Sequence, residues 1–108
     1  MPLKLPEPLD EYFAAANVND SRRAAACFTE DALVYDEGRE FRGRDAVRRW
    51  VEETGRKYRY KAVVLAVEQV ADRTVVTAHV TGEFPGSQID LHYRFKLADQ
   101  QIAALDIG

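Results

Sequence analysis

Residues 74–97, TVVTAHVTGEFPGSQIDLHYRFKL, decide the fold of this chain. Apolar or small side chains occupy every second position in 74–84, and the alternation returns in 88–97 after turn residues at 85–87. A period of two is typical of strands that bury one face, so the pattern predicts a hairpin with one side in the core. The predicted inner faces are Val76, Ala78, Val80, Gly82 and Phe84 on the first strand, and Ile89, Leu91, Tyr93, Phe95 and Leu97 on the second.

Two further β-rich runs flank this hairpin, residues 59–70 before it and residues 101–107 after it. The connecting segments at 71–73 and 98–100 are far shorter than the dozen or so residues that a parallel crossover needs. The four runs are therefore predicted to form an antiparallel meander.

The first part of the chain has helical periodicity instead. Pro8 suits a first helical position, and apolar residues recur at three- and four-residue spacing through residues 9–16. Asp20 or Ser21 can cap a second, short helix that continues through Phe28. The sequence thus predicts a helical hairpin ahead of the sheet.

Between the hairpin of helices and the meander, a short strand over 32–36 and its return over 40–42 precede a third amphipathic helix. This helix is expected over 45–54, with Gly55 as its left-handed cap. Its polar side concentrates arginines and glutamates, which is typical of a solvated face with ion pairs. Helices first and strands later predict an α+β fold in which three helices pack on the concave face of a curved antiparallel sheet.

Composition limits the classes of function. The chain has 108 residues and a net charge of −3, which suits one domain over residues 1–108 and argues against a nucleic-acid binder. No segment has the roughly 20 apolar residues of a membrane span, and residues 1–6 lack the apolar run of a secretory signal. We therefore expect a cytoplasmic protein without a membrane or nucleic-acid partner, and Cys27, the one cysteine, is expected in the core.

Metal and cofactor motifs are missing from the sequence. His79 and His92 fall on the outer face of the hairpin, and no third ligand is suggested beside them. No glycine-rich phosphate loop or hydrolase triad is present. We expect no metal and no cofactor. Residues 62–67 are apolar at consecutive positions, which places hydrophobic side chains on both faces of the sheet and predicts a homodimer.

Four stretches, taken in order, resemble the nuclear transport factor 2-like superfamily, and within it the SnoaL-like and ketosteroid-isomerase-like proteins. They are EYFAAAN at 11–17, FTEDALVYD at 28–36, FRGRDAV at 41–47 and HYRF at 92–95. The resemblance extends over residues 9–107 and implies a cone-shaped fold with an apolar pocket. It does not specify an activity, because this superfamily contains isomerases, cyclases, dehydratases, hydrolases and non-catalytic adaptors.

The resemblance also implies roles for individual residues. Tyr12 matches the tyrosine that donates a hydrogen bond to the substrate oxyanion in ketosteroid isomerases, and Asp36 matches the aspartate that shuttles the proton. Leu91 departs from that pattern, because those isomerases place a second acidic residue there. Asp90 is one residue out of phase and is expected on the other face of the strand. The implied pocket residues are Phe28, Trp50, Val76, Ala78, Val80, Gly82, Phe84, Leu91 and Tyr93.

Tyr12 and Asp36 together suit proton abstraction next to a carbonyl, in which a carboxylate takes the proton and a phenol stabilises the enolate. The expected ligand is small and apolar or carbonyl-containing. The alternatives are a homodimeric module that binds such a ligand without turning it over, and a partner-binding adaptor. The surroundings of Asp36 discriminate between them: an arginine partner such as Arg42 indicates a structural carboxylate, whereas an apolar pocket without one indicates a base.

Overall fold

The computed structural model describes residues 5–108, so residues 1–4 of the segment inspected for a secretory signal lie outside it. The elements follow the predicted order of helices, hairpin, helix and meander. They are α1 (Glu7–Asn17), α2 (Ser21–Ala26), β1 (Phe28–Asp36), β2 (Arg39–Arg42), α3 (Arg44–Tyr58), β3 (Lys61–Val70), β4 (Arg73–Thr81), β5 (Ile89–Ala98) and β6 (Gln101–Ile107).

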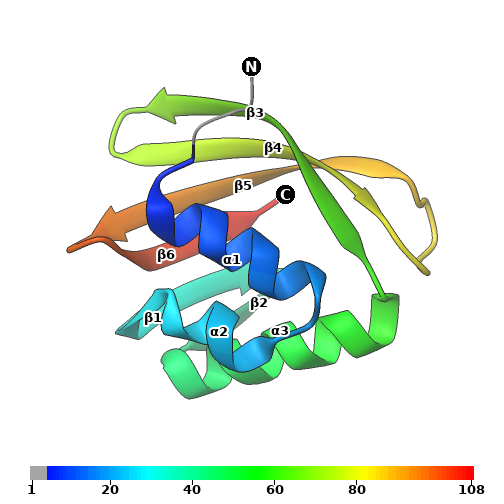
Figure 1. The fold of residues 1–108 in the computed structure, drawn as a ribbon, viewed down its shortest axis with the longest axis horizontal. Helices are drawn as coiled ribbons and strands as arrows, with labels where there is room; N and C mark the ends of the chain where they lie inside the picture. The colour runs from blue at the N-terminus through cyan, green and yellow to red at the C-terminus, as the bar shows by residue number, and fades with distance from the viewer. Residues whose placement is uncertain (1–4) are drawn as a thin grey trace.

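The strands form one curved sheet with the order β2-β1-β6-β5-β4-β3, and the three helices lie on one side of it (Figure 1). The predicted meander is confirmed, since β3, β4, β5 and β6 pair antiparallel in sequence order. The sheet continues beyond the meander because β1 pairs parallel with β6, with Leu33 opposite Ala104. The α+β fold with helices against a curved sheet is therefore as predicted.

The sequence prediction was wrong at three element ends. The strand expected over 74–84 ends at Thr81, so Gly82 and Phe84, predicted on its inner face, lie beyond the strand. Phe28 does not end the second helix but begins β1, four residues before the expected strand start at Ala32. The third helix runs past Gly55 to Tyr58, and Arg59 adopts the left-handed conformation, with φ 47°. Gly55 lies inside the helix, and a Cβ there would lie 2.3 Å from the side-chain oxygen of Asn19, so that side chain would have to move.

The strand alternation of the central hairpin is confirmed. Val76, Ala78, Val80, Tyr93 and Phe95 are all buried, whereas the alternate positions on the same strands are half-exposed or exposed. The inner side chains pack against α1 and β1 in one hydrophobic core. The predicted parity therefore assigns the inner face of the sheet correctly.

An aromatic cluster anchors α1 on the sheet. The ring of Tyr12 makes edge-on contacts with Phe28 and Phe95 at centroid distances of 5.7 and 5.9 Å. Phe13 contacts Tyr93 in the same way at 5.1 Å. Edge-to-face pairs at these distances are favourable beyond the area they bury, so this cluster fixes how α1 lies across the sheet.

The end of α1 is fixed to the edge strand by one amide. The Asn17 side chain donates to the Ala62 carbonyl at 2.9 Å and accepts from the Ala62 amide at 2.8 Å. Lys61 also donates to the Asn17 carbonyl. Asn17 thereby satisfies backbone groups of β3 that a neighbouring strand would otherwise bind.

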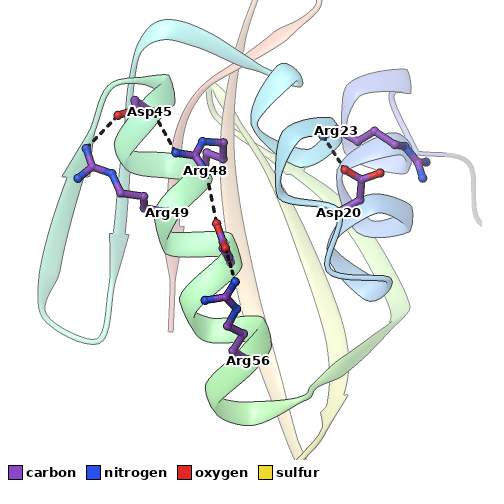
Figure 2. A network of polar contacts seen from close by, with 7 residues as sticks. Asp20, Arg23, Asp45, Arg48, Arg49 and Arg56 are labelled. Carbon is purple, nitrogen blue, oxygen red and sulfur yellow. Dashed lines mark hydrogen bonds and ion pairs between the residues drawn. The ribbon is translucent and has the colours of Figure 1, made fainter.

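The polar side of α3 carries a chain of ion pairs, as predicted (Figure 2). Asp45 contacts Arg48 and Arg49 at 3.3 and 3.0 Å. Glu52 joins Arg48 to Arg56 through contacts of 3.3 and 2.6 Å. These pairs lie at i, i+3 and i, i+4 spacing on an exposed surface, so they support the helix modestly and form no site.

The outer side of β3 exposes apolar side chains. Val63 and Leu65 are 60% and 50% exposed, and a register shift between Val64 and Ala66 interrupts the alternation. Cys27 is buried, as expected. Within the described part of the chain, no helix is long and apolar enough to cross a bilayer, and no group of three or more metal-binding side chains occurs.

Candidate active-site cavity

A cavity of about 320 Å³ opens on the inner side of the sheet, between α1, α3 and the strands β4 and β5. Seven of its lining residues belong to the set implied by the resemblance: Tyr12, Asp36, Trp50, Val80, Phe84, Leu91 and Tyr93. Seven others were not anticipated: Glu37, Thr54, Tyr58, Tyr60, Pro85, Ile89 and Ile107. The fold thus brings the two expected chemical groups, Asp36 and Tyr12, to one cavity.

Four expected wall residues do not line this cavity. Phe28, Val76 and Ala78 are fully buried in the core, where other side chains cover them. Gly82 instead allows two backbone segments to lie close together, because a Cβ there would lie 2.7 Å from the Tyr58 carbonyl oxygen. Strand parity identified the correct face, but a face contains both core and cavity positions, and parity cannot separate them.

Asp36 is half-buried at the end of β1, and one donor orients its carboxylate. The indole nitrogen of Trp50 donates to Oδ2 at 3.0 Å. Burial raises the pKa of the carboxyl above its ordinary value, and the Glu37 charge adds to this rise. The Trp50 hydrogen bond and a backbone hydrogen bond from Glu37 oppose it. Desolvation therefore dominates and makes this aspartate a stronger base than an exposed one.

No lysine or arginine in residues 5–108 forms an ion pair with Asp36. Arg39 is opposite Asp36 in the β1–β2 register, but its guanidinium lies over the Phe41 ring, 5.1 Å from the centroid. The alternative considered above, in which a neighbouring arginine pairs with Asp36 and makes it a structural carboxylate, therefore does not apply.

Tyr12 reaches the cavity from α1 and is 1% exposed. Burial raises its pKa well above the usual value, and the neighbouring Tyr60, Tyr93 and Asp36 raise it further. The phenol therefore keeps its proton at neutral pH and can only act as a hydrogen-bond donor or a neutral acceptor. This is the protonation state that stabilisation of an oxyanion requires.

Tyr60 is a site residue that the sequence reasoning missed. Burial raises its pKa to about 12, and hydrogen bonds with Tyr12 and Thr54 partly offset the rise. Thr54 in turn donates to the Trp50 carbonyl at 2.8 Å. Tyr60 lies between α3 and β3, two residues after Tyr58, so neither helix nor strand periodicity marked it as a site residue.

The mouth of the cavity is built from Glu37, Tyr58 and Phe84. The Tyr58 hydroxyl donates to Glu37 Oε1 at 2.8 Å, and its ring meets Phe84 edge-on at 5.8 Å. Backbone contact strengthens the closure, since the Glu83 amide donates to the Tyr58 carbonyl at 2.6 Å. The end of α3 and the β4–β5 connection are therefore held together at the entrance.

Strand β5 contributes no acidic group to the cavity. Leu91 lines it, whereas Asp90 lies on the other face and contacts His79 Nδ1 at 2.7 Å. The Asp90 hydrogen bond is the main cause of a raised His79 pKa. The cavity therefore combines one carboxylate suited to take a proton with neutral phenols, and Leu91 supplies only apolar surface.

Comparisons with known proteins agree with this architecture. The chain matches the model of the SnoaL-like domain over residues 9–105. A candidate polyketide cyclase from Sinorhizobium meliloti is 36% identical, with a TM-score of 0.91 over 96% of this chain and 95% of that one. No protein in the search of curated proteins matches significantly.

Two more distant structures share the fold alone. A protein with a ketosteroid isomerase-like fold from Catenulispora acidiphila, solved in complex with trimethylamine, is 15% identical, with a TM-score of 0.87 over 97% of this chain and 86% of that one. A cystatin-fold protein from Novosphingobium aromaticivorans is 17% identical, with a TM-score of 0.79 over 99% of both chains.

Proposed function

This chain belongs to the SnoaL-like domain family, and we propose that it is a cofactor-independent enzyme of the isomerase or cyclase type. Its reaction is the abstraction of a proton next to a carbonyl, with Asp36 as base and Tyr12 as oxyanion donor. The observation that carries this proposal is the carboxylate of Asp36, which faces a cavity beside a buried, neutral phenol and has no cationic partner among the described residues.

The proposed step uses only groups of this chain and the substrate. The Asp36 carboxylate takes a proton from the carbon beside the carbonyl, and the electron pair of that C–H bond moves to the carbonyl oxygen. The Tyr12 hydroxyl donates a hydrogen bond to the oxygen as its negative charge grows. For isomerisation, Asp36 then returns the proton to another carbon. For cyclisation, the enolate carbon instead bonds to a second carbonyl carbon, the π electron pair of that carbonyl moves to its oxygen, and protonated Asp36 gives its proton to the resulting alkoxide.

Trp50 and the apolar wall support this chemistry. The Trp50 indole holds Oδ2 of Asp36, which leaves Oδ1 for the substrate proton. Val80, Leu91 and Tyr93 exclude water from the ligand. With Leu91 in place of a second acid, one oxyanion donor is absent, which typically costs on the order of 10²–10³ in rate. We therefore expect slower turnover of neutral ketones than in an isomerase with two donors.

The test is isomerisation of β,γ-unsaturated ketones by the wild type, Asp36→Asn and Tyr12→Phe. Loss of a positioned base costs about 10²–10⁴ in rate, so Asp36→Asn should abolish detectable turnover and Tyr12→Phe should weaken it. Asp90→Asn removes a carboxylate from the outer face and serves as the matched control. Equal rates in all these proteins, across several ketones, would reject the catalytic proposal and leave a ligand-binding module.

The dependence of kcat/KM on pH is a second test of the same proposal. The base works only when ionised, so kcat/KM should fall as the pH drops through the raised pKa of Asp36. The acidic limb should therefore lie above the ordinary aspartate range of about 4. A limb at or below that value would assign the base to another group.

We also propose that the protein forms a homodimer through the outer face of the sheet. The support is the exposure of Val63 and Leu65, together with Val70 at 48%, on the edge strand β3. Large apolar side chains grouped on one exposed face are a common feature of protein interfaces.

A further inference from the structure

We propose that the cavity selects a carbonyl compound that also carries an ammonium group. This inference rests on the proposed function for the carbonyl, whereas the preference for positive charge stands on the cavity itself. Two carboxylates, Asp36 and Glu37, line the cavity, and no lysine, arginine or histidine of residues 5–108 lines it. A ligand cation would therefore meet carboxylate charge without a competing cation of the protein at the wall.

The cations nearest the entrance lie outside this wall. Arg39 and Lys57 line an adjoining, smaller cavity of about 120 Å³, which shares Asp36, Glu37, Trp50, Thr54 and Tyr58 with the larger one. Lys57 lies over the Tyr58 ring at 5.0 Å from its centroid, as Arg39 does over Phe41. Each is thus occupied by an aromatic face, and neither forms an ion pair with Asp36.

Aromatic rings make up much of the remaining wall. They are Tyr12, Trp50, Tyr58, Tyr60, Phe84 and Tyr93. The face of an aromatic ring carries partial negative charge and attracts cations, most strongly where water is excluded. Burial is the main cause of the raised pKa values of Tyr12, Tyr60 and Tyr93 and disfavours charge of either sign, whereas the Asp36 charge, which raises all three pKa values further, acts against negative charge alone. The cavity therefore favours a positive ligand over a neutral one of the same shape, and disfavours an anion.

A substrate cation would also compensate for the oxyanion donor that Leu91 does not provide. Enolate formation places negative charge on the substrate oxygen, where Tyr12 is the proposed donor and β5 supplies no second acid. An ammonium group within the same substrate lies close to that charge and stabilises it electrostatically, without a further protein residue. Leu91 in place of a second acid and a cavity wall without lysine, arginine or histidine then favour the same substrate, a carbonyl compound with an ammonium group.

Asp36 should contribute more to this charge preference than Glu37. Glu37 already accepts the Tyr58 hydrogen bond, is exposed to solvent, and interacts with the charge of Lys57. Asp36 is half-buried and has only the Trp50 indole as a side-chain donor. Charge interactions are stronger where the dielectric constant is lower.

The test uses two probes of equal shape, trimethylphenylammonium and tert-butylbenzene, with benzenesulfonate as an anionic comparison. Binding is measured at pH 8 by NMR titration, with the Trp50 indole proton as the reporter of the site. We expect trimethylphenylammonium to bind at least tenfold more tightly than tert-butylbenzene, and benzenesulfonate to bind most weakly. Asp36→Asn should reduce cation affinity about tenfold and leave tert-butylbenzene unchanged, Glu37→Gln should reduce it less, and Asp90→Asn should have no effect.

Equal or tighter binding of tert-butylbenzene, no cation binding at millimolar concentration, or cation affinity insensitive to Asp36→Asn would each overturn this inference. These binding results are separate from turnover. A protein that prefers the cation but isomerises no ketone contradicts only the proposed reaction. A protein that isomerises neutral ketones through Asp36 and shows no charge preference contradicts only the selection of an ammonium group.

Discussion

Two parts of the inner face of the sheet are both rich in aromatic residues, yet in one the rings pack on one another and in the other they surround a cavity. Where α1 crosses the sheet, Phe13, Phe28 and Phe95 contact Tyr12 or Tyr93 edge-on, and none of these three phenylalanines lines the main cavity. Toward the end of β1, the rings of Trp50 and Tyr58 stand around about 320 Å³ of space. The number of aromatic residues alone therefore does not decide whether a part of this face contains a cavity.

The two regions differ in the contacts that hold their rings in place. Phenylalanines have no polar group and gain only by packing on one another, so they fill their region. Trp50 and Tyr58 are instead held at their polar ends, by Asp36 at 3.0 Å and Glu37 at 2.8 Å. A ring fixed in this way can stand beside empty space. These hydrogen bonds to carboxylates fix both rings at the cavity wall.

The largest expected effect is a difference in stability loss between two substitutions, one made in each region. Phe95→Ala removes a fully buried ring and should cost about 3–5 kcal/mol of unfolding free energy. Phe84→Ala removes a half-buried ring at the cavity mouth and should cost much less, because water already reaches that site. Urea denaturation of both variants measures this contrast, and equal losses would show that the two regions do not differ in packing.

Trp50→Phe tests whether the polar attachment holds the ring. The variant keeps an aromatic ring but leaves Asp36 without its indole donor, which should cost about 1–3 kcal/mol of stability. A hydrogen bond to the ionised carboxylate lowers its pKa, so losing this bond should raise the pKa of Asp36 further. The acidic limb of the activity profile should move to higher pH. Phe13→Leu, an aromatic substitution outside the cavity, is the control and should leave that limb in place.

Asp36→Asn should have a smaller effect on stability, and in the opposite direction. Burial raises the folded-state pKa of Asp36, so its ionisation weakens the fold increasingly as the pH rises from the unfolded value of about 4 through the raised value. Asparagine cannot ionise and still accepts from Trp50. The variant should therefore be more stable than the wild type at pH 8 and nearly equal to it at pH 3, measured by thermal unfolding. A less stable variant at pH 8 would contradict the desolvation of this carboxylate.

The smallest effect on the folded monomer is expected on the opposite face of the sheet. Val63→Lys changes an exposed position and should alter monomer stability by no more than about 0.5 kcal/mol. It should nevertheless dissociate the proposed dimer, because it places a charge within the apolar patch. Val18→Lys is the matched control, since Val18 is 65% exposed at the end of α1. Sedimentation velocity that shows a wild-type monomer at tens of micromolar would remove the dimer proposal.

The local pattern of the sequence was sufficient for most of the fold. Alternation placed Val76 and Val80 in the core because the period of a strand is a property of adjacent residues. The pairing of β1 with β6 was not predicted, since Leu33 and Ala104 meet only through tertiary packing. The role of Gly55 was misassigned for a related reason: its close neighbour is the side chain of Asn19, in the connection between α1 and α2.

The candidate site was less accessible to sequence reasoning. The resemblance brought Asp36 and Tyr12 forward, but Tyr60 and Glu37 have no periodic signal of their own. Tyr60 lies between a helix and a strand, and Glu37 lies in a turn with positive φ of 53°. Both reach the cavity because of backbone direction at the ends of elements, which residue spacing does not encode.

The parallel pairing of β1 with β6 also has a consequence for the order in which the chain folds. The hairpins of β3 to β6 join neighbours in sequence and can form early, whereas Phe28 must find Ile102 across most of the polypeptide. Closing so long a loop carries an entropic cost that is recovered only after the strands align, so this contact should govern the folding rate. Asp36 ends β1, and Leu91 lies on β5 beyond β6. We therefore expect the two walls of the cavity to come together only when this long-range contact forms.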